Sequence, residues 1–247
     1  MLLAVDIGNS NIKFGIFDSE RLISKFSIPT SNELSADDLK SLIDSKISVT
    51  NAIVCSVVPE KEPSLMDALL HAFGIEAVIV RNDLDLGLKI NYQPLSTIGT
   101  DRLVNSLAAA EKHGVPCIVC SLGTATAFDV IDQNRELLGG IIAPGMKTMA
   151  KALHLNTAKL PEVNIEKPKS LIANTTATSI QSGIFYGHIA MIEGIIKRIL
   201  KEISVEPRVI ATGGFASLIA ENTTSIDIVD ENLLLDGLRF LNDRIRK

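Results

Sequence analysis

An internal repeat constrains the fold of this chain of 247 residues more than any other feature. The segments AVDIGNSNIKFGIFD (4–18) and VCSLGTATAFDVID (119–132) share one plan. Each has an apolar run, a loop with glycine and small polar residues, a second apolar run, and an aspartate before a polar turn. A unit that recurs at about half the chain length indicates duplicated domains. In this correspondence Asp6 matches Ser121, Gly8 matches Gly123, Asn9 matches Thr124 and Asn11 matches Thr126.

Short apolar runs alternate with helical patterns in both halves, which predicts an α/β fold. Strands are expected at 2–7, 13–17, 22–28, 53–58 and 77–80, and again at 117–121, 127–131, 137–142, 208–212 and 225–229. Helices are expected at 36–45, 63–73, 100–113 and 176–202, with others beginning near 145, 215 and 232. We expect one domain over 1–115 and a second over 116–247, with a terminal helix that could pack back on the first.

Composition and charge exclude several classes of function. The net charge of −5 argues against a broad surface for nucleic acid or anionic membranes. No apolar run approaches the ~18 residues that a membrane span needs. The N-terminus has no basic region and reaches Asp6 after a short apolar run, so a cytoplasmic location is expected. Cys117 and Cys120 in C-I-V-C would point to opposite faces of a strand, which favours buried thiols over a metal or redox pair.

The first copy of the repeat, DIGNSNIK, has the composition of a phosphate-binding turn. Glycine lets backbone N–H groups approach an anion, and the small polar residues add neutral donors. A carboxylate at Asp6 suits Mg²⁺, and Lys13 could neutralise phosphate charge. Ordinary hairpin chemistry explains the same residues equally well.

The segment IGTDR, residues 98–102, precedes a predicted helix. Asp101 is a candidate base for a substrate hydroxyl proton, and the planar guanidinium of Arg102 could bind a carboxylate of the acceptor. The alternative is that Asp101 complements the positive end of the helix dipole.

Three further segments have both functional and structural explanations. TGG at 212–214 could let a purine lie against bare backbone, or could simply lead into a helix. Thr175 and Thr176 are candidate helix N-caps, and Gly183 and Gly187 suggest close approach of another helix. The region 159–176 is expected to be a long loop, either functional or a disordered connector.

The ordered set DIGNSNIK, NYQPLSTIGTDR, SLGTATAFD, GGIIAPGM, NTTATSIQSG and TGG resembles the type III pantothenate kinases over nearly the whole chain. The resemblance implies an actin-like or sugar-kinase-like fold built from two ribonuclease-H-like domains. It implies ATP-dependent phosphorylation of pantothenate, the first step of coenzyme A synthesis, by a cytoplasmic homodimer with Mg²⁺ and a monovalent cation, K⁺ or NH₄⁺.

The resemblance also assigns roles to residues. Asp101 would accept the proton, and Asp6 would lie near Mg²⁺ and contact the ion through water. ATP phosphates would be bound by Asp6, Ile7, Gly8, Asn9, Ser10, Asn11, Ile12, Lys13 and Thr124. Pantothenate would be contacted by Tyr92, Gly99, Thr100, Asp101, Arg102 and Thr175, and Thr175 could reach it from a partner subunit.

The chain departs from the family pattern at two positions. Family members usually carry Asp where this chain has Ser121, and Thr where it has Ala127. The Asp is associated with the monovalent cation, so we expect a modified cation site at Ser121, with a weakened or rebuilt cation dependence. The alternatives are a catalytically impaired relative with an accessory or regulatory role, and a kinase for another small hydroxyl acceptor.

Overall fold

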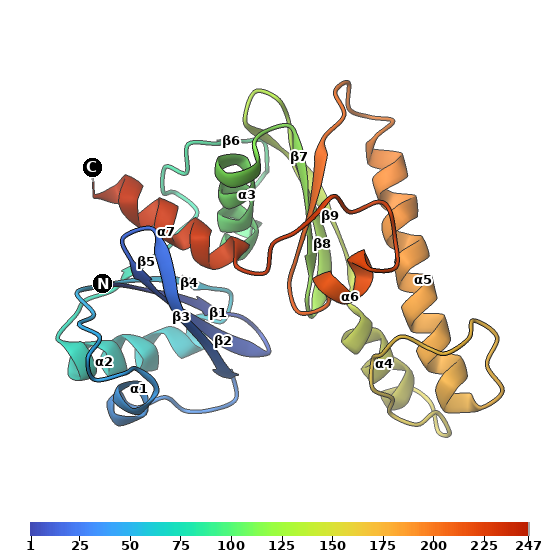
Figure 1. Ribbon diagram of the computed structural model, residues 1–247, viewed down its shortest axis with the longest axis horizontal. Helices are drawn as coiled ribbons and strands as arrows, with labels where there is room; N and C mark the ends of the chain where they lie inside the picture. Colours follow the sequence, from blue (N-terminus) through green and yellow to red (C-terminus); the bar gives the residue numbers. More distant parts are fainter. Residues whose placement is uncertain (247) are drawn as a thin grey trace. The chain divides into compact units, whose positions relative to one another are not determined.

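The computed structural model describes residues 1–246, which form two compact units (Figure 1). Unit 1 comprises Met1–Leu88, Tyr92–Glu111 and the segment from Asn232 onward. Unit 2 comprises Lys89–Asn91 and Lys112–Glu231. The terminal helix therefore belongs to unit 1, and the two units interleave along the chain instead of meeting at one boundary.

Unit 1 is a five-stranded sheet with helices, and its strands lie in the order β3-β2-β1-β4-β5. The strands are β1 (Leu2–Ile7), β2 (Asn11–Asp18), β3 (Arg21–Pro29), β4 (Asn51–Ser56) and β5 (Val78–Ile79). The helices are α1 (Ala36–Leu42), α2 (Glu62–Phe73), α3 (Thr100–His113) and α7 (Leu233–Ile245), with 3-10 turns η1 (Pro59–Lys61) and η2 (Leu95–Thr97).

Unit 2 is a six-stranded sheet in the order β11-β10-β7-β8-β9-β6. Its strands are β6 (Lys89–Ile90), β7 (Cys117–Leu122), β8 (Ala125–Ile131), β9 (Glu136–Pro144), β10 (Arg208–Thr212) and β11 (Ile228–Val229). Its helices are α4 (Met146–Leu155), α5 (Thr176–Ile199) and α6 (Ala216–Ala220).

The two sheets repeat one topology, as the internal sequence repeat predicts. In each unit three antiparallel strands are followed by two that continue parallel to the first, so β7-β8-β9-β10-β11 repeats β1-β2-β3-β4-β5. The short β6 is an addition at the free edge of β9. This arrangement confirms the expected α/β fold with a duplicated mixed sheet.

The two hairpin turns differ in length, which corrects one detail of the expected correspondence. Ile7 pairs with Ile12 across the first turn, whereas Leu122 pairs with Thr126 across the second. The first turn is therefore one residue longer. Thr126 corresponds to Ile12 in the sheet and not to Asn11.

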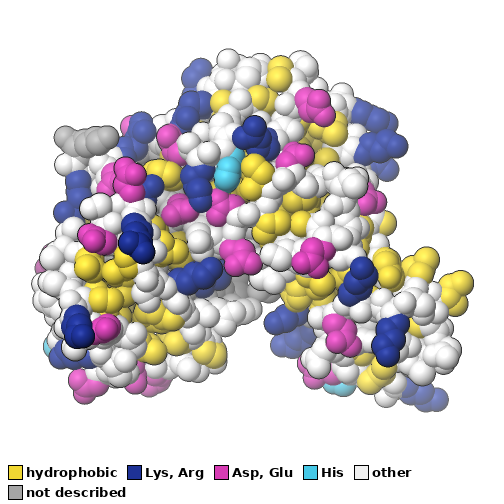
Figure 2. Space-filling model, in the orientation of Figure 1, with side chains coloured by type: hydrophobic (Ala, Val, Ile, Leu, Met, Phe, Trp, Pro, Cys, Tyr) yellow, Lys and Arg dark blue, Asp and Glu magenta, His cyan; other side chains and the backbone are white. Residues whose placement is uncertain are grey.

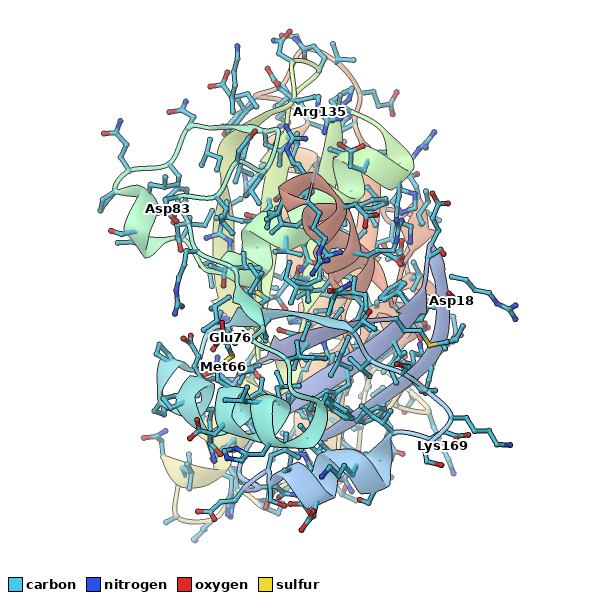
Figure 3. All side chains as sticks on the ribbon, turned by 90° about the vertical axis from the view of Figure 1, so that its left-hand side faces the viewer. Asp18, Met66, Glu76, Asp83, Arg135 and Lys169 are labelled. Atoms are coloured by element: carbon cyan, nitrogen blue, oxygen red, sulfur yellow. The ribbon has the colours of Figure 1, made fainter. Side chains whose placement is uncertain are left out.

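The core of unit 1 lies between its sheet and the helices α1 and α2, which lie together below the sheet in Figures 1 and 3. Phe14 of β2, Leu39 of α1 and Leu69 of α2 are fully buried there. Helix α1 begins at a capping box formed by Ser35 and Asp38. Helix α7 packs on the opposite face of the sheet, against β1, β4 and β2. Asp18, labelled in Figure 3, marks the end of β2 remote from the β1–β2 turn.

The core of unit 2 lies between its sheet and α4, α5 and α6. Phe128 of β8 and Phe185 of α5 are fully buried, as is Cys120 of β7. Cys117 is buried too, and both thiols are free, in agreement with the packing role expected for C-I-V-C. No regular element is assigned between Asn156 and Thr175, where a long loop was expected.

Gly237 of α7 allows this helix to approach α3 closely. A Cβ at this position would lie 2.5 Å from the carbonyl oxygen of Val104 and 2.7 Å from its Cγ1. We expect Gly237→Ala to lower the free energy of unfolding by roughly 1–3 kcal/mol, because the backbone of α3 must move. Gly194→Ala in α5 is the control: its Cβ meets nothing within 4 Å, so helix propensity should raise stability by up to about 1 kcal/mol. Urea unfolding measures both. Equal effects of the two variants would contradict the close contact.

Candidate functional site

Asp6 lies near the end of β1, just before the first hairpin turn, and is the one polar residue of that strand. It belongs to a cluster of acidic and basic side chains in unit 1. It is 5% exposed, and the sheet register places it opposite Lys13 of β2. The Nζ atom of Lys13 lies 3.6 Å from Oδ2 of Asp6. The alternation of β2 puts the exposed Lys13 beside the carboxylate while Ile12 and Phe14 enter the core.

Burial raises the pKa of Asp6 to about 6, and the negative charge of Asp101 adds to this rise, while Lys13 lowers it. The positive charge of Lys13 thus only partly compensates the buried carboxylate. A carboxylate in this state is a good ligand for an additional cation, which would stabilise its ionised form.

The β1–β2 turn is held in one conformation by backbone and side-chain hydrogen bonds. The N–H of Gly8 donates to the carbonyl of Asn11 at 3.0 Å, and the hydroxyl of Thr30 donates to the carbonyl of Gly8 at 2.6 Å. The N–H of Thr30 also donates to the carbonyl of Ser10. Thr30 is a support for the turn that the sequence patterns did not indicate.

The predicted phosphate-binding residues divide into two groups by burial. Asn9, Ser10 and Asn11 are exposed at the turn. Ile7 and Ile12 are buried in the core of unit 1, so these two could contact a ligand only through their backbone.

Asp101 lies in the first turn of α3 and is half-buried. Its Oδ1 accepts a hydrogen bond from the N–H of Arg102 at 2.9 Å. Burial raises the pKa of this carboxyl, against the opposing effects of Arg102 and Lys13. A Cβ on Gly99 would lie 2.5 Å from Oδ1 of Asp101, so glycine is needed for this carboxylate to fold back over the helix start.

Thr100 faces inward and supports α3. Its hydroxyl donates to the carbonyl of Ser56 at the end of β4 at 3.0 Å, and lies 3.3 Å from Sγ of Cys55. Cys55 is the register partner of Asp6 in the adjacent strand. The side chain of Thr100 therefore links the start of α3 to the strand beside Asp6, and its hydroxyl is occupied within the protein.

Arg102 and Tyr92 lie together at the same end of α3. The guanidinium carbon of Arg102 lies 5.4 Å from the centre of the Tyr92 ring, a cation–π distance. The intervening segment is held by Asn82, whose amide donates to the carbonyls of Leu95 at 2.8 Å and Ile98 at 2.6 Å. Asn82 is a second supporting residue that sequence patterns did not indicate.

The second hairpin turn, in unit 2, carries Thr124 and is closed by α4. The carbonyl of Thr124 accepts hydrogen bonds from the N–H of Gly145 at 3.0 Å and the hydroxyl of Thr148 at 2.6 Å. A Cβ on Gly145 would overlap the carbonyl oxygen of Gly123, so only glycine permits this approach. Thr124 itself is exposed.

The T-G-G segment packs against the same turn. Gly213 has φ +99°, and a Cβ there would lie 2.6 Å from the carbonyl oxygen of Leu122. Ser121, at the end of β7, is half-buried and pairs with Ala127 and Thr212. Ser121, the predicted cation position, therefore lies beside the end of β10 and the glycines that follow it.

Thr175 is the N-cap of α5. Its hydroxyl oxygen accepts from the N–H of Thr178 at 3.2 Å and lies 2.7 Å from the Thr178 hydroxyl. The side chain is exposed. The structural explanation offered for this threonine therefore holds, and a role toward a ligand would be in addition to capping.

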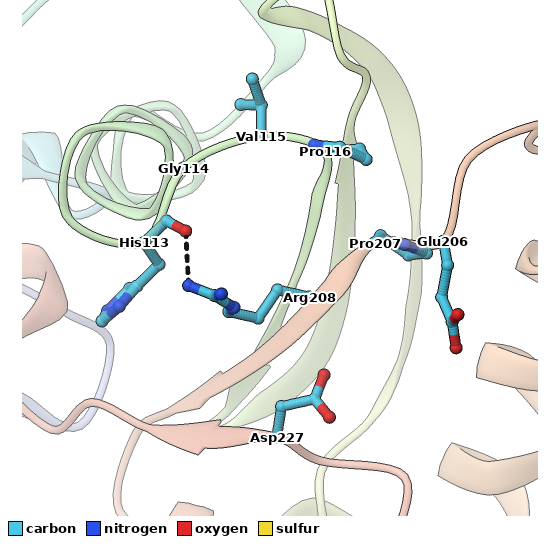
Figure 4. A pocket seen from close by; sticks show the side chains of 8 residues that line it. All are labelled: His113, Gly114, Val115, Pro116, Glu206, Pro207, Arg208 and Asp227. Carbon is cyan, nitrogen blue, oxygen red and sulfur yellow. Dashed lines mark hydrogen bonds between the residues drawn. The ribbon is translucent and has the colours of Figure 1, made fainter.

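Two hollows of unit 2 lie apart from the second hairpin turn, the G-T-A-T turn of residues 123–126. One, of about 440 Å³, is lined by His113, Arg208 and Asp227 among others, and Arg208 donates to the carbonyl of His113 at 2.8 Å (Figure 4). It lies where β7 and β10 begin, at the end of these strands opposite Ser121. The other is an apolar groove of about 680 Å³ between α4 and the start of α5.

Within unit 1 the structure brings together Asp6, Lys13 and Asp101, with Thr100 supporting the last of them. Within unit 2 it joins Thr124 and Ser121 at one turn, while Thr175 lies on a separate helix end. Residues 1–246 contain no group of three or more His, Cys, Asp or Glu side chains arranged to hold a metal. In the same residues, no helix is long and apolar enough to cross a membrane.

The repeated sheet and its hairpin turns define the class of the fold. A protein from Campylobacter jejuni assigned to the Baf family of transcriptional activators is similar in structure, with a TM-score of 0.63, 18% identity and coverage of 99% of this chain and 98% of its own. MreB 5 of Spiroplasma citri, solved with AMPPNP, has a TM-score of 0.51 at 8% identity and covers 99% of this chain and 96% of its own. The chain has the actin-like and sugar-kinase-like fold of duplicated ribonuclease-H-like units.

Sequence comparison identifies the family within this fold. Residues 2–198 match the model for type III pantothenate kinase. A type III pantothenate kinase of Finegoldia magna is 40% identical over 98% of this chain and 97% of its own length, and one of Geotalea uraniireducens is 39% identical over the full length of both. The chain belongs to the type III pantothenate kinase family.

Proposed function

We propose that this protein transfers the γ-phosphoryl group of ATP to the primary hydroxyl of pantothenate, giving 4'-phosphopantothenate for coenzyme A synthesis. Family membership supports this reaction and both substrates. The observation that carries the assignment to residues is the cluster in unit 1 of two carboxylates, the buried Asp6 and the half-buried Asp101, with Lys13 beside Asp6.

In this proposal Asp101 is the proton acceptor. The hydroxyl oxygen of pantothenate attacks the γ-phosphorus, and the bond from that phosphorus to the bridging oxygen of ADP breaks. The hydroxyl proton passes to Asp101, which later releases it to solvent. Because the transition state of phosphoryl transfer is loose, a carboxylate needs only modest basicity for this role. The hydrogen bond from the N–H of Arg102 fixes the orientation of the carboxyl group.

Arg102 is the proposed partner of the pantothenate carboxylate. Its planar guanidinium can bind a carboxylate through two parallel hydrogen bonds. Stacking against Tyr92 would hold the guanidinium plane while it does so. Gly99, Thr100 and Thr175 remain proposed contacts, but the buried hydroxyl of Thr100 restricts that residue to backbone contact.

Kinases of this family use a metal ion associated with ATP, and the residues present fit one. Asp6 is a buried carboxylate with an incompletely compensated charge, and we assign Mg²⁺ to its vicinity, held through water. When bound, the ion would neutralise phosphate charge. Lys13 would add a second positive charge, and the turn from Gly8 to Asn11 would offer backbone and side-chain donors to the phosphates.

The proposed contribution of unit 2 to ATP binding is the turn at Thr124. Hydrogen bonds from α4 and the close packing of Gly213 make this turn a rigid support. The monovalent cation, K⁺ or NH₄⁺, is assigned to the neighbourhood of Ser121, where a neutral hydroxyl replaces the carboxylate expected from the family resemblance.

Assembly into a homodimer is also proposed, and the surface of unit 2 supports it. Leu155 is 67% exposed, Leu171 64% and Ile172 90%. Hydrophobic side chains gather near α4 and the start of α5 on the right of Figure 2, beside the apolar groove. A Cβ on Gly183 or Gly187 of α5 would meet nothing within 4 Å. The cytoplasmic location and the lack of nucleic-acid or membrane partners stay predictions.

Acceptor profiling tests the proposed function. The purified protein is given Mg-ATP with pantothenate, with small sugars, with other hydroxy acids, or with no acceptor, and ADP release is followed. Release that depends on pantothenate supports the proposal. Release with a different acceptor identifies another kinase, and nucleotide binding without turnover on any acceptor indicates an accessory protein.

The cation assignment gives a separate prediction at Ser121. Ser121→Asp places a charge at a half-buried position, so the variant should be less stable than the wild type without K⁺ and should gain more thermal stability on adding K⁺ than on adding Na⁺. We expect its kinase activity to become several-fold more dependent on K⁺ than that of the wild type. Ser121→Asn is the neutral control of similar size. If Ser121→Asp and Ser121→Asn respond to K⁺ alike, the cation does not bind there.

A further inference from the structure

A buried histidine of α5 contacts the strand that leaves the G-T-A-T turn. His188 is 2% exposed, and its Nε2 lies 2.9 Å from Oγ1 of Thr126, which is 1% exposed. Its Nδ1 has no hydrogen-bond partner among the residues that the structure describes. The adjoining helix residues Phe185, Ile189 and Ile192 belong to the apolar core. A polar ring in such surroundings costs free energy, and its single hydrogen bond to Thr126 compensates only part of that cost.

Thr126 connects this histidine to the turn. It is the second residue of β8, directly after Thr124 and Ala125, and it pairs across the hairpin with Leu122. The opposite parts of the same turn are held by other elements: α4 binds the carbonyl of Thr124, and Gly213 packs on the carbonyl of Leu122. The contact from α5 supports the turn at the point where the chain re-enters the sheet.

We propose that His188 is a positioning residue for ATP binding: it holds the hydroxyl of Thr126 and thereby fixes the turn that receives the phosphates. This inference rests on the proposed function of the turn. His188 does not touch the nucleotide and acts through Thr126. Burial lowers the pKa of His188, so the ring is neutral near pH 7 and requires no counter-charge in the core.

The physical reason is preorganisation. A turn with glycine and small residues has many accessible conformations, and backbone donors bind an anion well only when they are fixed beforehand. A hydrogen bond made inside the core fixes β8 against α5 more firmly than one at the surface, since no water competes for either partner.

A double-mutant cycle separates positioning from packing. His188→Phe and Thr126→Val each keep the approximate shape and remove one partner, so each single variant should be less stable than the wild type. The double variant has an apolar pair, and its melting temperature should recover toward that of the wild type. We expect its Kd for Mg-ATP, measured by calorimetry, to remain about fivefold to tenfold weaker, the effect of one lost hydrogen bond. The KM for pantothenate should change little.

Thr126→Ser keeps the hydroxyl and is the conservative control, which should bind Mg-ATP like the wild type. The inference is overturned if the double variant regains ATP affinity together with stability, or if Thr126→Ser binds as weakly as Thr126→Val. Binding is measured without an acceptor, so a wild type that binds Mg-ATP but does not phosphorylate pantothenate would reject the proposed function while leaving this test valid. A wild type that binds no Mg-ATP would reject both.

Discussion

Asp101→Asn is expected to lower kcat for pantothenate phosphorylation by roughly 10²–10⁴-fold, because the amide cannot accept the substrate proton. The substitution preserves size, and the amide oxygen can still accept the hydrogen bond from the N–H of Arg102. The KM values for ATP and pantothenate should therefore change much less than kcat. Steady-state kinetics with each substrate varied in turn makes the measurement.

The competing explanation of Asp101 is a favourable interaction with the dipole of α3, and a matched control distinguishes the two. Asp37 lies in the first turn of α1 and is exposed. If Asp101 serves only its helix, Asp101→Asn and Asp37→Asn should each cost at most about 1 kcal/mol of stability and leave kcat nearly unchanged. A loss of kcat in Asp101→Asn alone, with similar melting temperatures, identifies the catalytic role.

Asp6→Asn is expected to stabilise the metal-free protein while it removes most of the kinase activity. Burial raises the pKa of Asp6 to about 6 in the folded protein, so at neutral pH the ionised carboxylate opposes folding. Removing that charge should raise the free energy of unfolding by roughly 1–3 kcal/mol above pH 6. Activity should fall because an amide is a poor ligand for Mg²⁺ beside the phosphates.

The pH dependence of this stability difference follows from the sign of the pKa change. Because the folded-state pKa lies above the unfolded value near 3.8, the folded protein takes up the Asp6 proton at a higher pH than the unfolded chain, and it gains stability as pH falls from about 6 toward 4. The wild type should therefore approach the stability of Asp6→Asn over that range. Urea unfolding of both proteins, without metal or nucleotide, measures it. A constant difference from pH 7 to pH 4, or a variant less stable than the wild type at pH 7, would contradict the account.

Much of the fold could be predicted from the sequence, because the hydrophobic pattern of each strand and helix is local and the same order of patterns occurs in both halves of the chain. The predicted strands over 2–7 and 208–212 coincide with β1 and β10, and the predicted helix over 100–113 coincides with α3. The predicted helix over 176–202 extends beyond α5, which ends at Ile199. The two-residue β6 was not predicted, since Lys89–Ile90 forms a strand only by pairing with β9.

The candidate site was less accessible to prediction because its supports depend on tertiary contacts. Asp6 and Asp101 could be selected as carboxylates beside glycine-containing turns. Nothing local to Thr100 indicates that its hydroxyl bonds to the carbonyl of Ser56, and the contacts of Asn82 and His188 likewise involve residues distant in sequence. Gly145 belongs to the segment GGIIAPGM that contributes to the family resemblance, but its contact with the second turn is a tertiary contact that the segment itself does not reveal.

The most direct test of the central claim is identification of the product. The protein is incubated with Mg-ATP and pantothenate, and the mixture is examined by phosphorus NMR and mass spectrometry, with Asp101→Asn treated in parallel. We predict that 4'-phosphopantothenate forms in amounts equal to the ADP released, and that the variant forms almost none in the same time. Folded wild-type protein that yields no phosphorylated pantothenate with any monovalent cation would contradict the claim that this chain is a pantothenate kinase.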